Sequence, residues 1–287
     1  MEINTVMTDF GDLKGKVAVI TGGSGVIGQT LVRGLCNAGV RVIILDVNPA
    51  RGAVTANEMA KRPDCSVAAA VGASVTDRES LLKAREEIRS AFGQIDILIN
   101  CAGGNKATAT TAREFIKADD KDLKGTFFDL DIAGFDDVFD LNFKGTVLPT
   151  MIFSEDMLNK GGGVILNISS MNAFRPLTKI PAYSAAKAAI NNLTQWLAVH
   201  FAPAGVRVNA IAPGFLLTNQ NRFLLTDEKT GEMTPRGKKI INATPMGRYA
   251  EPGELVGTML YLLSGTSSFV TGVVIPVDGG FSAYSGV

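Results

Sequence analysis

The stretch "VAVITGGSGVIGQTLVRGLCNAG" at residues 17–39 decides the fold. A short run of apolar and β-branched residues ends at Gly22, and a helical pattern begins near Gly28. The glycines at 23, 25 and 28 allow a tight turn and a close approach of the backbone to a pyrophosphate. The first N–H groups of a helix add partial positive charge there. In this context the sequence predicts a strand, a phosphate-binding turn and a helix, and the alternative is a plain glycine-rich turn.

The rest of the sequence repeats this alternation of strand and helix. A helix is predicted over 77–92, with Asp77 as its N-cap and Leu81, Leu82 and Ile88 on its apolar face. Six further apolar runs are typical of strands covered on both faces, at 40–46, 65–71, 95–100, 162–169, 206–213 and 272–280. The pattern predicts an α/β fold, a Rossmann-type, doubly wound, parallel, seven-stranded sheet with helices on both faces.

Composition narrows the classes of function. Lys+Arg and Asp+Glu are both 28, so a near-zero net charge argues against nucleic acid or an anionic membrane as the main partner. Three unclustered cysteines, Cys36, Cys65 and Cys101, indicate reduced thiols rather than a disulfide framework or a metal site. The only histidine, His200, lies at the end of an apolar helical pattern, which favours a packing or helix-end role over a place in a catalytic triad and argues against a site with several histidines. The sequence has neither a membrane span nor a signal peptide pattern, so a cytoplasmic location is expected.

A second stretch, "SSMNAFRPLTKIPAYSAAKAA" at 169–189, suggests chemistry. Tyr183 and Lys187 lie one helical turn apart, and Ser170 precedes the tyrosine by thirteen residues. A nearby ammonium group favours a phenolate, so the pair could act as an acid and base. The alternative is a partly buried tyrosine beside a solvated lysine.

The end of the predicted strand 40–46 bears on the cofactor. Asp46 could accept hydrogen bonds from the adenosine ribose hydroxyls and would repel a 2′-phosphate. Residues 47–49 bring no arginine for that phosphate. The sequence therefore predicts NAD(H) in preference to NADP(H), although Asp46 could also be an ordinary turn former at a strand end.

With "NCAGG" at 100–104 and Asn142 added, the sequence resembles the short-chain dehydrogenase/reductase family. The resemblance covers residues 13–287 as a single domain behind an N-terminal extension, 1–12. It implies that Tyr183 is the catalytic acid/base and that Lys187 lowers its pKa and binds the nicotinamide ribose. It further implies that Ser170 binds the reacting oxygen and that Asn142 holds a water of a proton relay. The cofactor residues that it implies are Gly22, Ser24, Val26, Ile27, Gly28, Asp46, Ser74, Val75, Asn100, Ala102, Gly103, Tyr183, Lys187, Pro213, Gly214, Phe215 and Thr218.

Two positions depart from the family pattern. Val26 stands where the short single-domain branch has a glycine, so the loop fits the pattern of the extended branch of sugar-nucleotide epimerases and dehydratases. The length of the sequence, "NCAGG" and Asn142 nevertheless suit the short branch. Ser74 stands where an aspartate commonly contacts adenine, and its hydroxyl can still form a hydrogen bond.

Within the family, stretches such as "INCAGGN" at 99–105 and "TPMGR" at 244–248 are similar to the bacterial D-mannonate oxidoreductases that belong to it. This similarity implies an enzyme that interconverts a secondary alcohol and a ketone on a sugar acid, D-mannonate and D-fructuronate. Alternatives are a gluconate-type or polyol dehydrogenase, a ketoacyl reductase, or a dinucleotide-sensing regulator without catalysis. The family also implies a homotetramer.

Two long polar segments could shape the substrate site. An insertion lobe at 104–135 is expected near the active-site mouth, or else as a surface insertion. A lid is expected at 215–245, or else a flexible excursion. The candidate substrate ligands are Lys106 and Arg175 for a carboxylate, Asn172 for a hydroxyl, and Ser170 with Tyr183 for the reacting oxygen.

Overall fold

The computed structural model of this protein covers residues 9–62, 65, 67–217, 225 and 231–286. Seven strands form one sheet in the order β3-β2-β1-β4-β5-β6-β7, and every pair of neighbours is parallel. This confirms the predicted doubly wound, seven-stranded sheet. The strands are β1 (Val17–Thr21), β2 (Arg41–Asp46), β3 (Val67–Gly72), β4 (Ile97–Asn100), β5 (Gly163–Ile168), β6 (Val206–Pro213) and β7 (Val274–Val277).

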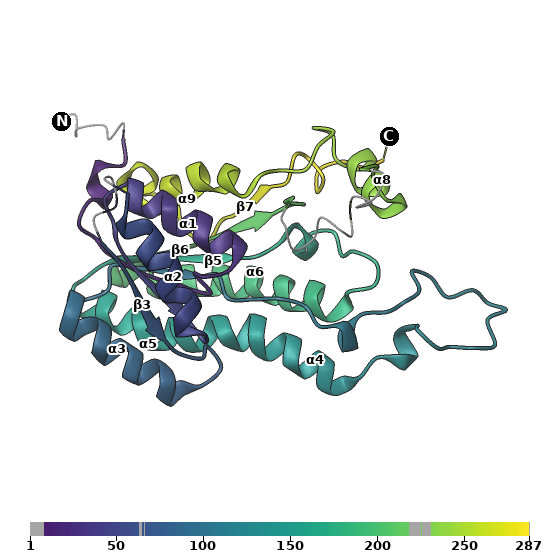
Figure 1. The fold of residues 1–287 in the computed structure, drawn as a ribbon, viewed down its shortest axis with the longest axis horizontal. Coiled ribbons are helices and arrows are strands. Elements are labelled where there is room, and N and C mark those ends of the chain that lie inside the picture. Colours follow the sequence, from purple (N-terminus) through teal and green to yellow (C-terminus); the bar gives the residue numbers. More distant parts are fainter. Residues whose placement is uncertain (1–8, 63–64, 66, 218–224, 226–230, 287) are drawn as a thin grey trace.

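Helices cover both faces of the sheet (Figure 1). Alternate strand residues point to opposite cores, so Ile20 and Ile44 pack on one side while Val19 and Ile43 pack on the other. The first core is covered by α1 (Val26–Asn37), α2 (Pro49–Ala60) and α9 (Val256–Leu263). The second is covered by α3 (Arg78–Phe92), α5 (Gly145–Asn159) and α6 (Pro181–Phe201).

Helix α3 begins where the sequence predicts it. The Asp77 side chain accepts hydrogen bonds from the N–H groups of Glu79 at 3.0 Å and Ser80 at 3.2 Å, so it is the N-cap. Leu81 and Ile88 are buried in the second core. The apolar spacing and the N-cap residue together predicted the position of this helix correctly.

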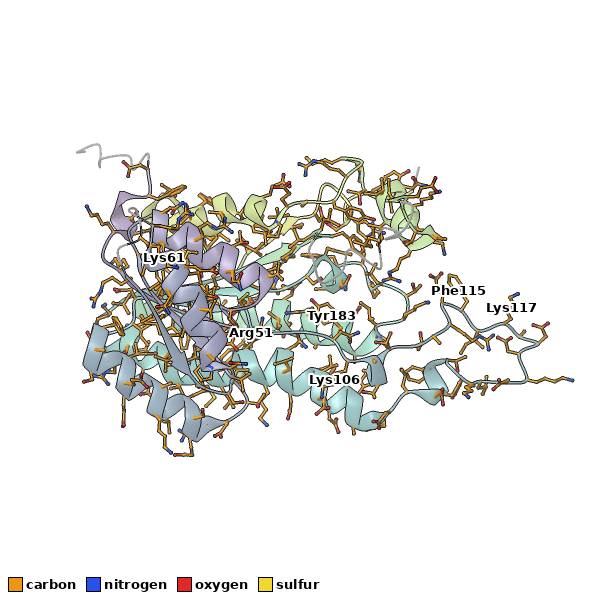
Figure 2. All side chains as sticks on the ribbon, viewed as in Figure 1. Arg51, Lys61, Lys106, Phe115, Lys117 and Tyr183 are labelled. Carbon is orange, nitrogen blue, oxygen red and sulfur yellow. The ribbon has the colours of Figure 1, made fainter. Side chains whose placement is uncertain are left out.

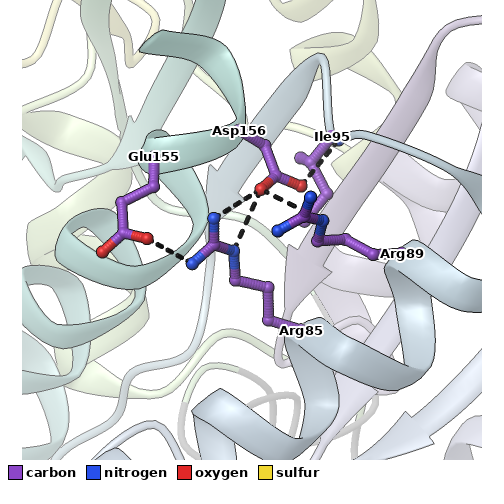
Figure 3. Close-up of polar contacts among 5 residues, drawn as sticks. All are labelled: Arg85, Arg89, Ile95, Glu155 and Asp156. Atoms are coloured by element: carbon purple, nitrogen blue, oxygen red, sulfur yellow. Dashed lines mark hydrogen bonds and ion pairs between the residues drawn. The ribbon is translucent and has the colours of Figure 1, made fainter. Parts of the chain in front are cut away.

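A charged cluster joins α3 to α5 (Figure 3). Arg85 donates to Asp156 through Nε at 3.0 Å and Nη2 at 2.6 Å, and it also bonds Glu155. Asp156 is fully buried and also accepts from the N–H of Ile95 at 3.2 Å, while Arg89 Nε lies 3.7 Å away. The buried carboxylate therefore has charged and neutral donors that compensate its loss of hydration.

A distorted helix carries Asn142. Helix α4 (Ile132–Phe139) runs into a π-helical turn, η4 (Asp140–Lys144), and then into α5. Short π-helical segments inside α-helices occur often at functional sites. Asn142 lies in this turn and is fully buried.

Residues 104–131 form an arm that projects from the body next to α4 (Figure 1), and the last four residues of the lobe predicted at 104–135 belong to α4 itself. It contains two short 3₁₀ helices, η2 (Ala107–Ala109) and η3 (Phe127–Asp129), and no strand. At its base, Ala109 packs with Val138 and Ala182 in a small core that also contacts Tyr183. The arm is thus tied to the helix that carries the candidate acid/base.

The predicted lid contains α8 (Pro235–Asn242). Within that region, residues 218–224 and 226–230, and with them Thr218, lie outside the described residues, as does most of the extension 1–12. The remaining 3₁₀ helices are η1 (Gly11–Leu13), η5 (Met171–Ala173), η6 (Ala202–Ala204), η7 (Pro252–Leu255) and η8 (Gly265–Ser267). Among the residues that the structure describes, no helix has the length and apolar character that crossing a membrane requires.

Candidate active site

A cavity of about 820 Å³ lies at the carboxyl ends of the strands. This is where open α/β sheets bind ligands, beside the point at which the strand order reverses between β1 and β4. Most of the predicted site residues line it: Gly22, Ser24, Val26, Ile27, Gly28, Asp46, Ser74, Val75, Ala102, Gly103, Ser170, Tyr183, Lys187, Pro213, Gly214 and Phe215. Residues that are distant in the sequence therefore meet in one space.

The glycine-rich turn between β1 and α1 is closely packed. A Cβ atom on Gly28 would lie 2.3 Å from the carbonyl oxygen of Gly22, so only glycine fits there. Gly25 caps α1 without a side chain, and Val26 and Ile27 are the first two helical residues. Their N–H groups at the helix N-terminus suit a pyrophosphate. Val26 therefore replaces the glycine of the short-branch pattern without disturbing the start of the helix.

One end of the cavity combines a carboxylate with a cation. The Ser24 hydroxyl donates to Asp46, and Asn48 N–H donates to Asp46 Oδ1 at 3.0 Å. Arg51, which lines the same cavity, donates from Nη2 to the Ser24 carbonyl oxygen at 3.2 Å. Arg51 was not predicted, because it lies beyond residues 47–49, which directly follow the strand. The sequence does contain a signal for its position. Asn48 followed by Pro49 is typical of a helix start, and α2 begins there and includes Arg51 in its first turn.

Ser74 lines this end of the cavity, and its hydroxyl has a neighbour. Ser74 Oγ lies 3.0 Å from Thr76 Oγ1, and Ser74 N–H donates to Ser80 Oγ at 3.1 Å. Thr76 also lines the cavity and was not predicted. Two hydroxyls thus lie near the place where the family pattern has a carboxylate.

Asn100 lies behind the cavity rather than in its lining. Its Nδ2 donates to Asn167 Oδ1 at 2.8 Å and to Thr150 Oγ1 at 3.0 Å. The adjacent turn is held by Thr21, whose Oγ1 accepts from Cys101 N–H at 3.0 Å and Ala102 N–H at 3.1 Å. The Asn100 side chain therefore links β4 to β5 and α5, and it is not among the residues that could contact a cofactor in the cavity.

Asn142 braces the same turn from α4 and η4. Its Nδ2 donates to Gly104 O at 2.7 Å, and its Oδ1 accepts from Gly104 N–H at 3.2 Å. A Cβ on Gly103 would lie 2.7 Å from Asn142 Oδ1 and 3.2 Å from Lys187 Nζ. The absence of a side chain at Gly103 thus lets Asn142 and Lys187 both approach the turn at 100–104.

The three residues of the predicted acid/base site converge at the opposite end. Lys187 Nζ lies 5.6 Å from the Tyr183 ring centroid and donates to Ile168 O at 2.8 Å. Burial raises the pKa of the Tyr183 phenol, while a hydrogen bond with Ser170 opposes that rise. Burial lowers the pKa of the Lys187 ammonium to about 8. The arrangement brings a phenol, a hydroxyl and an amine to one wall of the cavity.

The three other predicted substrate ligands lie outside the cavity lining. Lys106 pairs with Asp137, and Arg175 Nε donates to Ser282 O at 3.2 Å (Figure 2 shows Lys106). Asn172 is buried, its N–H donates to Ser170 Oγ at 3.2 Å, and its Oδ1 has no partner among the described residues. Both cations are therefore already engaged elsewhere.

A second cavity, of about 720 Å³, lies at the amino ends of the strands. Among the residues that line it, Lys160 bonds Asp96, and Arg207 donates to the carbonyl oxygens of Ser264 and Val270 at 3.1 Å. Its lining lacks the tyrosine–lysine pair that marks the other cavity. Within the part of the protein that the structure describes, no cluster of histidine, cysteine, aspartate or glutamate could hold a metal ion.

Known proteins share this architecture. A family model described as enoyl-(acyl carrier protein) reductase matches residues 23–282. A Haemophilus influenzae structure, provisionally named a D-mannonate oxidoreductase and solved with NAD bound, is 50% identical, covers 96% of this protein and 98% of its own length, and has a TM-score of 0.91.

Two curated relatives are similar over nearly their whole length. An uncharacterized oxidoreductase of Bacillus subtilis is 48% identical over 277 residues, 96% of this protein and 98% of the relative. A 2-dehydro-3-deoxy-D-gluconate 5-dehydrogenase of Dickeya dadantii is 31% identical over 273 residues, 95% of this protein and 97% of the relative. Together with the sheet order and the family match, these relatives show that the protein is an oxidoreductase of the short-chain dehydrogenase/reductase family.

Proposed function

We propose that the protein is an NAD(H)-dependent oxidoreductase that interconverts a secondary alcohol and a ketone on a sugar acid, D-mannonate and D-fructuronate. The observation that carries this proposal is the layout of one cavity. Asp46 lines this cavity together with Ser170, Tyr183 and Lys187, so a carboxylate for ribose hydroxyls and a candidate acid/base share one space. The 50% identical structure was solved with NAD bound and is provisionally named a D-mannonate oxidoreductase. It therefore supports NAD(H) as the cofactor and D-mannonate as the substrate.

The residues of the cavity fit a dinucleotide. The close packing at Gly28 leaves the start of α1 open to phosphates, and Asp46 can accept from ribose hydroxyls. A bound nicotinamide ring would accept a hydride from the substrate alcohol or return one to the ketone. The reaction also requires the transfer of one proton, which Tyr183 would carry out.

In the direction of oxidation, Ser170 would hold the substrate oxygen and the Tyr183 oxygen would take its proton. Proximity contributes here because both hydroxyl groups face the same space. The Lys187 ammonium, next to Gly103 and Asn142, would pass a proton between Tyr183 and the solvent side. Its pKa of about 8 lets it bind and release a proton near neutral pH.

The proposed assembly is a homotetramer. Large apolar side chains are exposed on α6 and α5, namely Trp196 at 58%, Val199 at 78% and Met151 at 58%. Exposed apolar surface of this kind favours contact between subunits.

A substrate panel read by NADH absorbance tests the function. We expect turnover of D-mannonate with NAD and of D-fructuronate with NADH, with weaker turnover of D-gluconate. The Tyr183→Phe variant, which lacks the phenol oxygen, is the negative control. Faster oxidation of D-gluconate than of D-mannonate would favour a gluconate-type dehydrogenase, which the 31% identical relative supports. No turnover of either acid in the wild type would refute the proposed substrate class.

A further inference from the structure

Segment 278–286 follows β7 and packs against part of the cavity lining. Residues 213–216 belong to that lining. Gly214 N–H donates to Val277 O at 2.9 Å, and a Cβ on Gly214 would lie 2.5 Å from the Cα of Asp278. Only glycine therefore lets the start of the segment approach the lining this closely.

The aromatic rings of Phe215 and Phe281 connect the segment to the same part of the lining. Their centroids lie 5.3 Å apart at an interplanar angle of 73°, which is an edge-to-face contact. Phe215 lines the cavity, whereas none of the described residues 278–286 does. Phe281 therefore supports a cavity residue from outside, and any effect that it has on a bound substrate passes through Phe215.

The side chain of Asp278 fixes the shape of the segment. Its Oδ1 accepts from Gly280 N–H at 3.0 Å, and its Oδ2 accepts from Ser282 N–H at 2.8 Å. Phe281 N–H donates to the carbonyl oxygen of Asp278 at 3.2 Å. These bonds hold Phe281 and Ser282 in one compact turn, so the position of one depends on that of the other.

Arg175 connects this turn to the loop that carries Ser170. Its Nε donates to Ser282 O at 3.2 Å. The short 3₁₀ helix η5 lies between Ser170 and Arg175. Within it, Ala173 N–H donates to Ser170 O at 3.0 Å. Arg175 N–H donates to the carbonyl oxygen of the buried Met171, also at 3.0 Å. A short, hydrogen-bonded turn therefore couples the position of Ser170 to that of Ser282.

We propose that segment 278–286 is a brace that fixes the position of Ser170 relative to Phe215, and that Arg175 is a positioning residue that acts through its hydrogen bond to Ser282. This inference rests on the proposed function, in which Ser170 holds the reacting oxygen of the substrate. A misplacement of about 1 Å can lower a rate about 100-fold, so the brace affects kcat rather than the binding of NAD. Arg175 thus contributes to the reaction although its side chain lies outside the cavity lining.

Two substitutions of Arg175 separate its hydrogen bond from its charge. Arg175→Gln removes the charge but keeps an N–H donor on the same carbon, Cδ, whereas Arg175→Met removes both. We measure kcat with the alcohol that the wild type oxidises fastest. Arg175→Met should lower it about tenfold, the effect of losing one charge-assisted hydrogen bond, and leave the Kd for NAD unchanged. Arg175→Gln should keep kcat within about threefold of the wild type.

Ser282→Ala is the matched control. Arg175 bonds the backbone carbonyl oxygen of Ser282, so the loss of the serine side chain should change neither kcat nor the Kd for NAD. An unchanged kcat in Arg175→Met would overturn the proposal. A kcat in Arg175→Gln as low as that in Arg175→Met would also overturn it, because the charge of Arg175 would then matter rather than its bond to Ser282.

The contact between Phe215 and Phe281 allows a test of coupling. Phe281→Leu removes the edge-to-face contact and should lower kcat about two- to tenfold. Because Arg175 and Phe281 hold the same segment, Arg175→Met combined with Phe281→Leu should lose little more than the slower single variant. Losses that multiply would mean that the two residues act independently, which would refute the brace.

Hydrogen exchange separates this inference from the proposed function, because it needs no substrate. Phe281→Leu should speed exchange of the Ala173 and Arg175 N–H groups, which lie on the other side of the bond between Arg175 and Ser282. Equal exchange in this variant and the wild type would refute the brace, even if D-mannonate is oxidised. If the wild type oxidises only neutral polyols, while kcat and exchange change as expected, the brace stands and the sugar-acid substrate is refuted.

Discussion

The ammonium nitrogen of Lys187 lies 5.6 Å from the ring centroid of Tyr183, over the ring, and is bonded to the carbonyl oxygen of Ile168. The sequence predicted that this lysine lowers the pKa of the tyrosine. In the protein alone, burial dominates and raises the pKa of Tyr183, and Ser170 supplies the opposing hydrogen bond. Buried and held by Ile168, Lys187 does not make Tyr183 a strong acid by itself, so a further positive charge in the cavity would have to complete the activation.

Removing the phenol oxygen tests the role of Tyr183. Tyr183→Phe should lower kcat by about 10²–10⁴-fold, because a positioned acid/base contributes that much. The Kd for NAD, measured by quenching of protein fluorescence or by calorimetry, should change little since the ring stays in place. A variant that keeps near-normal turnover would rule out Tyr183 as the proton carrier.

The lowered pKa of Lys187 has a consequence for stability. Between pH 8 and the usual lysine pKa near 10.5, the unfolded protein binds a proton that the folded protein has lost, so stability should rise with pH. Urea unfolding at pH 7.5 and 9.5 should show the wild type gaining about 1–2 kcal/mol relative to Lys187→Met. The raised pKa values of Tyr183 and Cys101 make stability fall as the pH rises. Both the wild type and Lys187→Met contain these two groups, so their contribution cancels in the comparison. An equal pH response in both proteins would contradict a buried, weakly basic Lys187.

The sheet was predictable because its strands are apolar on both faces and are separated by helices with recognisable N-cap residues, such as Asp77. Most of the cavity was predictable for a related reason. In a parallel sheet the strand ends meet at one edge, so Gly28, Asp46 and Ser170 had to come together there.

The contacts of long polar side chains were not predictable. Lys106 and Arg175 follow cavity residues closely in sequence, yet each bonds a neighbour outside the cavity. Arg51 was missed because its position depends on where α2 starts, and the ion pair between Glu114 of the arm and Lys239 of α8 joins segments 125 residues apart. Local spacing fixes the backbone of the site, whereas tertiary packing decides where flexible cations go.

Asp46 offers a test of cofactor choice. Asp46→Ser should lower kcat/KM with NAD and raise it with NADP, each by about 10–100-fold, because the carboxylate no longer binds the ribose or repels a 2′-phosphate. Arg51 should carry the gain, since it lies beside Ser24 in the same cavity. Adding Arg51→Ala to Asp46→Ser should therefore remove the activity with NADP. If the double variant keeps that activity, Arg51 does not bind the phosphate.

The cluster between α3 and α5 allows a stability prediction that is independent of catalysis. Asp156→Asn should cost about 2–3 kcal/mol, because Arg85 would lose its buried anion while remaining mostly buried. Glu155→Gln, which changes the more exposed partner of the same arginine, should cost under about 1 kcal/mol. Urea unfolding at fixed protein concentration measures both, because assembly would otherwise shift the midpoint. Equal losses in the two variants would mean that burial does not determine how much Asp156 contributes to the free energy of unfolding. The expected difference would instead identify Asp156 as the anion that holds α3 against α5.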